Sequence, residues 1–217
     1  MKLRYAPTSP YVRKCLVVAI EAGVRDRIDL VPTNPWRPET TLGRDNPLGK
    51  VPALTTDDGV MLFDSSVICE YLDWLGAGPK LFPPPGPARW QALKVAALGE
   101  GILDAADVRI MESRRAPEKI DTAWDARKKA QVERALDELE RLVPGLAGID
   151  IGAVTLGCAL GELDFRFPDD DWRGSRPVLA RWYAGFAARP SMATTVTVLW
   201  DEWERRQRAA GRSPEVS

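Results

Sequence analysis

The sequence contains no histidine, and this absence excludes several kinds of enzyme at once. Hydrolases built on a Ser-His-Asp triad and proteases built on a Cys-His pair both need an imidazole base. Zinc and haem sites that bind the metal through histidine are excluded for the same reason. We therefore predict no metal site and expect a chemistry that works without an imidazole base.

Cysteine is also scarce, with three residues far apart in the sequence: Cys15, Cys69 and Cys158. They form no CxxC pair, and each lies in an apolar helical pattern, which predicts buried and unreactive thiols. A disulfide scaffold is not expected, which suits a reducing cytoplasm. The sequence shows no signal peptide and no apolar run approaching about 18 residues, so we expect a cytoplasmic protein with no membrane partner.

An excess of charge of one sign is lacking as well, because 30 basic residues balance 31 acidic ones. A nucleic-acid or anionic-membrane partner would require a basic surface, so we expect neither. The densest basic stretch, residues 204–208, lies at the C-terminal end of the chain. It predicts a solvated helix end or a frayed tail.

What is present, over the first 78 residues, is an alternation of strand and helix patterns that predicts a small α/β domain. Asp58-Gly59 separates two short apolar segments and predicts a β-hairpin. A loop rich in Pro, Trp, Arg and Asn is expected from Thr33 to Asn46. We predict strands at 2–6, 27–32, 52–56 and 60–63, and helices at 10–22 and from 65 to about 75.

A stretch rich in Gly and Pro, from Gly76 to Pro87, cannot continue a helix or pair as a central strand. We predict an interdomain linker at 79–87, which separates a domain at 1–78 from an all-α domain at 88–217. Within the second domain we predict helices at 88–114, 120–143, 151–164, 176–188 and 191–206.

Ser9-Pro10 follows the first predicted strand and begins the first predicted helix. Proline in the first helical turn loses no hydrogen bond, because the amides there have no partner within the helix. Those amides and the helix dipole favour an anion, such as a thiolate, beside Ser9. The alternative is that Ser9 is an ordinary N-cap.

Two further segments carry a similar signal. Val51-Pro52 begins the third predicted strand, where a cis peptide bond would present the Val51 backbone to an extended peptide; a trans proline on an edge strand is the alternative. Asp64-Ser65 begins another helix, where the amides and the Ser65 hydroxyl suit a carboxylate and Asp64 suits an ammonium. Here too, a plain N-cap is the alternative.

Together these segments resemble the cytosolic glutathione transferases over almost the full length of the chain. The resemblance rests on TSPYVRKC (8–15), NPLGKVPAL (46–54) and FDSSVICEYLD (63–73), with further similarity in GILDAADVR (101–109) and DIGAVTLGCALGELDFR (150–166). The chain most resembles bacterial members that carry Ser at the active position. It departs from the family's Ser/Thr-x-x-Asp capping box near residue 150, where it has Asp150 and Ala153.

The resemblance implies a thioredoxin-like domain that binds glutathione, followed by an all-α domain that supplies a pocket for a small hydrophobic electrophile. Ser9 would stabilise the glutathione thiolate, and Val51, before cis-Pro52, would pair with the cysteinyl unit. Asp64 and Ser65 would hold the γ-glutamyl group, and Lys50 would approach the glycyl carboxylate or remain a solvated charge. Glutathione would serve as co-substrate without a resident cofactor, in a homodimer that conjugates electrophiles for detoxification.

Several assignments within this resemblance stay open. Thr8 and Tyr5 compete with Ser9 as the hydroxyl beside the thiolate. The electrophile pocket is expected to involve Tyr11 and Trp36 together with three residues of one helix: Asp104, Val108 and Arg109. Arg109 would face an anionic substrate or form a structural ion pair.

Two other functions also remain open at this point. One is a non-catalytic module that binds glutathione or another protein. The other is a glutathione-dependent thiol-disulfide reductase, which needs a protein cysteine for the mixed disulfide. Ser9 occupies the place of that cysteine, and Cys15 lies almost two helical turns further on.

Overall fold

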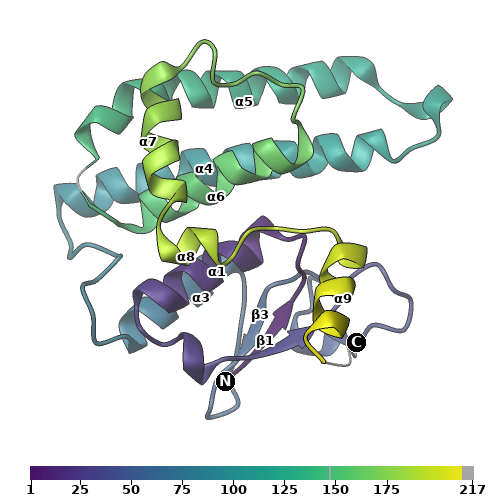
Figure 1. Cartoon of the computed structure of the whole chain (residues 1–217), viewed down its shortest axis with the longest axis vertical. Helices are drawn as coiled ribbons and strands as arrows, with labels where there is room; N and C mark the ends of the chain where they lie inside the picture. Colours follow the sequence, from purple (N-terminus) through teal and green to yellow (C-terminus); the bar gives the residue numbers. More distant parts are fainter. Residues whose placement is uncertain (147, 212–217) are drawn as a thin grey trace. The chain divides into compact units, whose positions relative to one another are not determined.

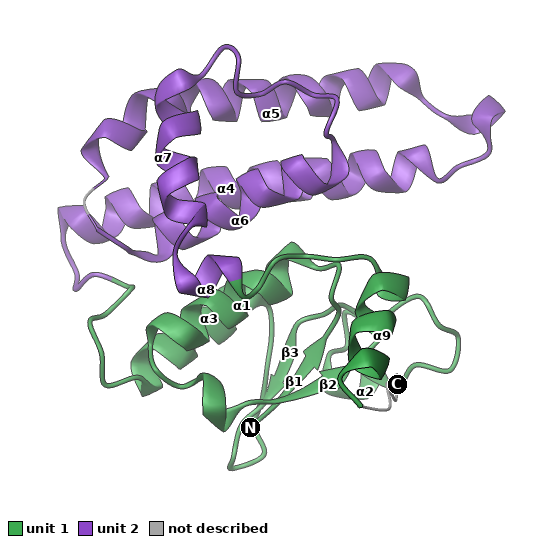
Figure 2. Cartoon of the chain, in the orientation of Figure 1, with its two compact units in different colours: residues 1–82, 194–217 green, residues 83–193 purple. Residues whose placement is uncertain are grey.

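The computed structural model describes residues 1–146 and 148–211, which fall into two compact units (Figure 2). Unit 1 combines Met1–Phe82 with the segment from Thr194 onward, and unit 2 is Pro83–Ala193. Unit 1 contains a four-stranded sheet with helices, and the described part of unit 2 contains helices without strands. The predicted fold class, α/β and thioredoxin-like followed by all-α, is therefore confirmed.

The sheet of unit 1 has the strand order β2-β1-β3-β4, and Figure 1 labels its two central strands, β1 and β3. The central strand β1 (Lys2–Tyr5) runs parallel to β2 (Asp29–Pro32) and antiparallel to β3 (Ala53–Thr55), and β3 forms the predicted hairpin with β4 (Met61–Leu62). Leu3 and Leu54 face each other across β1 and β3 and are fully buried. Burial of such alternating apolar side chains fixes the register of the sheet.

Two helices of unit 1, α1 (Pro10–Glu21) and α3 (Ser65–Leu75), pack against each other. The Sγ atoms of Cys15 and Cys69 are 3.9 Å apart at this contact, and both thiols are fully buried. Cys158 is buried as well, so the prediction of three free, buried thiols is confirmed. Glycine is needed where α3 ends, because a Cβ at Gly76 would lie 2.5 Å from the carbonyl oxygen of Ala22.

The predicted linker is partly anchored to unit 1. The buried carboxylate of Asp73, near the end of α3, accepts hydrogen bonds from the backbone amides of Leu81 (2.7 Å) and Phe82 (3.2 Å). The boundary between the units follows Phe82, and the first helix of unit 2 begins at Pro87.

Unit 2 is built around one buried helix. Residues 151–163 of this helix, α6 (Ile151–Arg166), are all buried, and Gly152 allows close packing because a Cβ there would lie 2.6 Å from the carbonyl oxygen of Ala92. Asp150 caps α6 by accepting a hydrogen bond from the Ala153 amide (2.8 Å), as the sequence predicts. The other elements of unit 2 are α4 (Pro87–Ser113), η2 (Pro117–Lys119), α5 (Thr122–Leu142), η3 (Val143–Gly145), α7 (Pro177–Ala187) and α8 (Pro190–Ala193).

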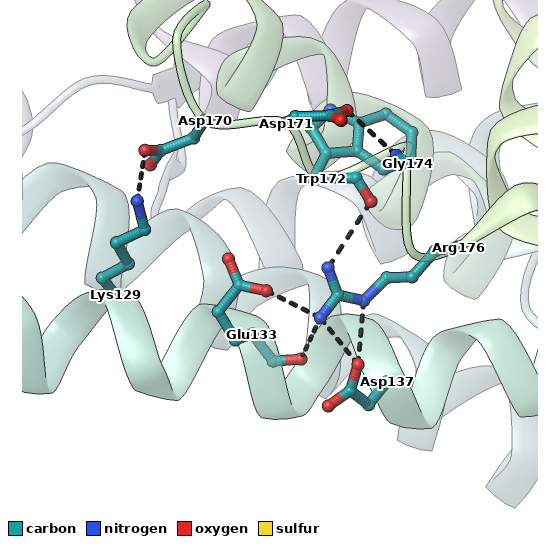
Figure 3. Close-up of polar contacts among 8 residues, drawn as sticks. All are labelled: Lys129, Glu133, Asp137, Asp170, Asp171, Trp172, Gly174 and Arg176. Atoms are coloured by element: carbon teal, nitrogen blue, oxygen red, sulfur yellow. Dashed lines mark hydrogen bonds and ion pairs between the residues drawn. The ribbon is translucent and has the colours of Figure 1, made fainter.

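Arg176 fixes the loop between α6 and α7 through the polar contacts drawn in Figure 3. Its side chain is buried, with 5% exposed. Its guanidinium donates to the carboxylates of Glu133 and Asp137 on α5, each at 2.6 Å, and also to the carbonyl oxygen of Trp172. A buried guanidinium needs such partners, because an unpaired buried charge is strongly destabilising. The carboxylates of Glu133 and Asp137 therefore serve the packing of unit 2.

The C-terminal part of the chain differs from the prediction of one helix at 191–206 in the all-α domain. The structure has α8 at Pro190–Ala193, an irregular segment at 194–199, and α9 at Trp200–Ala209, and the residues from Thr194 onward belong to unit 1. Five consecutive β-branched residues, 194–198, explain the interruption, because each loses side-chain freedom in a helix. Among the described residues, unit 2 ends at Ala193.

Two smaller elements complete unit 1: the 3₁₀ turn η1 (Arg25–Arg27) and the short helix α2 (Leu42–Asp45), which lies within the predicted 33–46 loop. Within the described ranges, no helix combines the length and the apolar character needed to cross a membrane.

Candidate functional site

The register of the sheet brings the three segments singled out from the sequence to one end of unit 1. Arg4 pairs with Ala53, so the end of β1 lies beside the start of β3. Leu62 pairs with Leu54, so the end of β4 lies at the same end of the sheet. Ser9 follows β1, Val51-Pro52 precedes β3, and Asp64-Ser65 follows β4. Three segments spread over 57 positions of sequence (9 to 65) therefore converge on one end of the sheet.

Ser9 is the N-cap of α1, and Pro10 occupies the first helical turn, as predicted. The Ser9 hydroxyl accepts a hydrogen bond from the Val12 amide at 3.3 Å, and the Ser9 amide donates to the carbonyl oxygen of Ala6 at 3.1 Å. A hydroxyl can accept from an amide and still donate its own proton elsewhere. The capping role is therefore compatible with donation to an anion.

The peptide bond between Val51 and Pro52 is cis, the first of the two alternatives. The preceding loop is shaped by Asn46, whose side chain donates to the carbonyl oxygen of Lys50 (2.7 Å) and accepts from the Leu48 amide (2.9 Å). Lys50 is exposed, whereas Val51 is half-buried. The sequence reasoning did not identify this role of Asn46. An Asn-Pro pair was an available signal, because it favours the start of a turn.

Asp64 is the N-cap of α3, and its carboxylate accepts a hydrogen bond from the Ser66 amide at 2.9 Å. Ser65, in the first turn, is 3% exposed. Behind this turn, the fully buried Lys14 of α1 places its Nζ atom 3.4 Å from the Ser66 hydroxyl. The start of α3 thus combines the exposed carboxylate of Asp64 and the positive end of the helix dipole with the buried ammonium of Lys14 behind the first turn.

Tyr5 and Thr8, the two competing hydroxyls, have different surroundings. Burial raises the pKa of the Tyr5 phenol from 10.0 to about 12, although Arg25 and Arg206 act in the opposite direction. The Tyr5 ring lies 6.1 Å from the ring of Trp203 on α9, as part of the packing of unit 1. Thr8 is half-buried in the turn before Ser9. A phenol with a raised pKa stays protonated at neutral pH and does not act as a tyrosinate base.

A cavity of about 330 Å³ adjoins Ser9 within unit 1. Its lining includes Pro7 and Ser9 from the loop, Val12 and Arg13 from α1, and Thr194–Thr197 from the C-terminal segment. The sequence reasoning did not identify this contribution of the C-terminal segment. The run of β-branched residues was the available signal, because it indicates a break in the helix.

The residues expected to form the electrophile pocket are divided between the units. Tyr11 and Trp36 belong to unit 1, where Trp36 is 66% exposed. Asp104, Val108 and Arg109 lie on α4 of unit 2. Asp104 is exposed and Val108 is half-buried. This part of the site stays a prediction.

Arg109 itself is 8% exposed and forms the structural ion pairs that the sequence left open. Its guanidinium donates to Asp125 (3.0 Å) and Asp170 (2.9 Å) and stacks 4.0 Å from the centre of the Phe167 ring. Partial burial raises the pKa of Asp170, but hydrogen bonds from Lys129 and Arg109 outweigh this effect and hold the pKa below its usual range. The guanidinium is therefore committed to the interior of unit 2.

Comparison with known proteins gives matches in both units. Residues 8–75 match the N-terminal domain family of glutathione S-transferases, and residues 122–185 match the C-terminal domain family. The "Uncharacterized GST-like protein YibF" of Escherichia coli is 32% identical over 90% of this chain and 98% of its own length.

Solved structures give the same result. A glutathione transferase family member from Pseudomonas fluorescens with bound glutathione is 44% identical, covers 91% of this chain and 99% of its own, and has a TM-score of 0.87. A glutathione S-transferase from Methylobacillus flagellatus with glutathione bound is 36% identical, with coverages of 91% and 99% and a TM-score of 0.86. The chain belongs to the glutathione S-transferase family.

Proposed function

We propose that the protein is a glutathione transferase in which the Ser9 hydroxyl stabilises the glutathione thiolate for attack on small hydrophobic electrophiles. The observation that carries the proposal is the convergence of Ser9, Val51-Pro52 and Asp64-Ser65 on one end of the sheet. The glutathione bound in the Pseudomonas and Methylobacillus relatives supports it.

A single hydroxyl is sufficient for this chemistry. A cysteine thiol with a pKa of about 8.5 is only ~3% ionised at pH 7, and lowering the pKa by two units takes about 2.7 kcal/mol. One hydrogen bond to a charged group supplies roughly 1.5–3 kcal/mol, and the N-terminus of α1 adds roughly 0.3–1 kcal/mol. Catalysis therefore needs neither a histidine base nor a resident cofactor, and glutathione is a co-substrate.

The rest of glutathione is assigned by chemistry. The Val51 backbone pairs with the cysteinyl unit, and the Asp64 carboxylate takes the ammonium of the γ-glutamyl group. The Ser65 hydroxyl and the first-turn amides of α3 take the γ-glutamyl carboxylate, because helix N-termini favour anions. Lys50, on an exposed loop, takes the glycyl carboxylate. Thr8 borders the thiol end of this site.

The residues proposed to contact the electrophile are Tyr11 and Trp36 in unit 1 and Asp104 and Val108 in unit 2. Arg109 is left out, because two carboxylates and the Phe167 ring already occupy its guanidinium. Because this guanidinium is not available to an anionic substrate, the proposal favours uncharged, hydrophobic electrophiles. Conjugation of such compounds is a detoxifying reaction.

A homodimer is part of the proposal. On α3, Val67, Tyr71 and Trp74 follow one another at helical spacing, and Trp74 is 70% exposed. Met61 at the adjoining sheet edge is 48% exposed. Exposed apolar side chains of this kind fit an interface with a second copy of the chain. Three free, buried thiols suit a reducing cytoplasm.

The reductase alternative is disfavoured by the surroundings of Cys15. Its side chain is 0% exposed and its Sγ atom donates to the carbonyl oxygen of Ser65 at 3.7 Å, so a disulfide substrate cannot reach it without opening the α1–α3 contact. Only a measurement of turnover distinguishes a transferase from a non-catalytic module that binds glutathione.

The test is retention on glutathione resin and heat stabilisation by millimolar glutathione, followed by turnover of chlorodinitrobenzene. The proposal expects both binding effects, and turnover that falls in Ser9→Ala. Absence of both binding effects contradicts it. Binding without turnover supports the non-catalytic module, and turnover that is unchanged in Ser9→Ala refutes the role of Ser9. Reduction of hydroxyethyl disulfide that survives Ser9→Ala but is lost in Cys15→Ala supports the reductase.

A further inference from the structure

The C-terminal strap, defined as residues 194–209, is part of unit 1. Its helix α9 is strongly polar, and Trp203 is the one buried residue among the described residues of that helix. The remaining turns are held by ion pairs within the helix, between Glu202 and Arg206 and between Glu204 and Arg208. Such i,i+4 pairs add only tenths of a kcal/mol to a helix. The buried indole therefore determines where α9 is anchored.

The indole is anchored at the end of the strand that leads to Ser9. Trp203 is 8% exposed, and its ring lies 6.1 Å from the ring of Tyr5, the last residue of β1. Trp200 packs edge-on against the same indole at 5.5 Å. In Figure 2, α9 accordingly belongs to the same unit as β1.

A second attachment is made by the backbone. The Val198 amide donates a hydrogen bond to the carbonyl oxygen of Pro7 at 3.0 Å, two residues before Ser9. Val198 is 7% exposed and its neighbour Thr197 is 5% exposed, so this bond is shielded from water. Residues 194–197 also line the cavity that Pro7 and Ser9 line. The strap therefore contacts the chain at two points beside Ser9: at Tyr5, just before the Ala6–Ser9 turn, and at Pro7, within it.

We propose that the C-terminal strap fixes the turn that carries Ser9, with Val198 and Trp203 as positioning residues for the Ser9 hydroxyl. This inference rests on the proposed function for its catalytic consequence. A hydrogen bond to a thiolate weakens steeply as its angle and distance depart from the optimum, so a hydroxyl on a loose turn stabilises the anion less. Preorganisation of a donor by packing outside the site is the general means of keeping that geometry.

The experiment compares Trp203→Ala and Val198→Pro with two matched controls. Trp203→Phe retains an aromatic ring against Tyr5. Leu199→Pro places the same substitution one residue further on, at a φ of −66° that already suits proline, and leaves the Val198 amide in place. Two quantities are measured: the pKa of glutathione's thiol in the complex, from its thiolate absorbance, and amide exchange in the 5–13 segment without glutathione.

In both test variants we expect exchange of the 5–13 amides to accelerate at least tenfold. We also expect the thiol pKa to rise by about one unit, which is a tenfold smaller ionisation constant. The glutathione KM should change less than about twofold, because Val51, Asp64 and Ser65 are untouched. Both controls should resemble the parent.

Unchanged exchange in the 5–13 segment overturns the inference, whatever the fate of the proposed function. Faster exchange with an unchanged thiol pKa also overturns it, provided that Ser9→Ala raises that pKa. If Ser9→Ala leaves the pKa unchanged, the proposed role of Ser9 fails instead, and the exchange data alone decide whether the strap fixes the turn.

Discussion

The two helices α1 and α3 both begin with an extended N-cap residue, but the capping atoms differ. Ser9 caps α1 with a hydroxyl that accepts from Val12 at 3.3 Å, and Asp64 caps α3 with a carboxylate that accepts from Ser66 at 2.9 Å. Both helices direct the positive end of the helix dipole towards this end of the sheet, which favours an anion. Only the hydroxyl can also donate a proton, and only the carboxylate carries a charge that attracts an ammonium. Under the proposed function, the cap therefore decides which part of glutathione each helix would take.

A third helix, α6 in unit 2, shows that a capped N-terminus is not in itself a binding site. Asp150 caps it in the same way, with 2.8 Å to the Ala153 amide, but residues 151–163 are all buried. Its first turn is packed against α4, where a Cβ at Gly152 would clash with Ala92. What distinguishes α1 and α3 is their position at one end of the sheet.

The largest effect is expected from Ser9→Ala, which removes the donor to the thiolate. We expect kcat/KM for chlorodinitrobenzene to fall about 10- to 100-fold, corresponding to roughly 1.5–3 kcal/mol for a hydrogen bond to a charged group. The KM for glutathione should stay within about twofold of the parent. Thr8→Ala is the matched control, and a loss of the same size in that variant would assign the thiolate to Thr8.

Asp64→Asn tests the other helix and should have the next largest effect. Asparagine caps a helix about as well as aspartate, so the free energy of unfolding should change by less than about 0.5 kcal/mol. Loss of the charge should weaken glutathione binding roughly tenfold, as measured by calorimetry. The thiol pKa within the complex should be unaffected, and a rise in that pKa would mean that the two helix starts do not act separately.

Asp150→Ala tests the cap of α6, which we expect to contribute to folding and not to glutathione binding. We expect the free energy of unfolding, measured in urea, to fall by about 1 kcal/mol, because the Ala153 amide loses its partner. Glutathione affinity should not change at 25 °C. Asp150→Asn should restore the stability, and a weakened affinity for glutathione in Asp150→Ala would argue against a purely structural cap.

Tyr5→Phe should have the smallest effect on activity, with kcat/KM within about twofold of the parent. The Tyr5 pKa is raised to about 12 in the folded protein from an ordinary 10.0, so the folded state holds its proton more tightly than the unfolded state. This contribution to stability is fully present below pH 10 and is lost as the pH rises towards 12. The parent should therefore lose more stability than Tyr5→Phe over that range, in urea titrations at stepped pH.

The order and bounds of most strands and helices in unit 1 were predictable from the sequence, because the signals that specify them are local. Ser9-Pro10, Asp58-Gly59 and Asp64 specify a cap, a turn and a second cap from the residue types alone, and the observed α1 and α3 end within about a residue of the predicted ends. Their convergence could be anticipated only through the resemblance, since it depends on the strand order and register.

Two features could not be predicted in this way because they depend on distant partners. Arg109 forms an ion pair with Asp170, 61 positions further along the chain, and no local pattern indicates that contact. The attachment of α9 depends on one indole meeting Tyr5, near the other end of the sequence, and no local pattern indicates that contact either. The break before α9 was predictable in principle from the β-branched run at 194–198.

The central claim is that Ser9 holds the thiol of glutathione in its ionised form. The most direct measurement is the thiolate absorbance of glutathione bound to the parent protein and to Ser9→Ala, titrated against pH. We predict a thiol pKa about two units below the free value in the parent and a return most of the way to the free value in Ser9→Ala. A parent complex whose thiol titrates like free glutathione, or a Ser9→Ala complex that titrates like the parent, would contradict the claim.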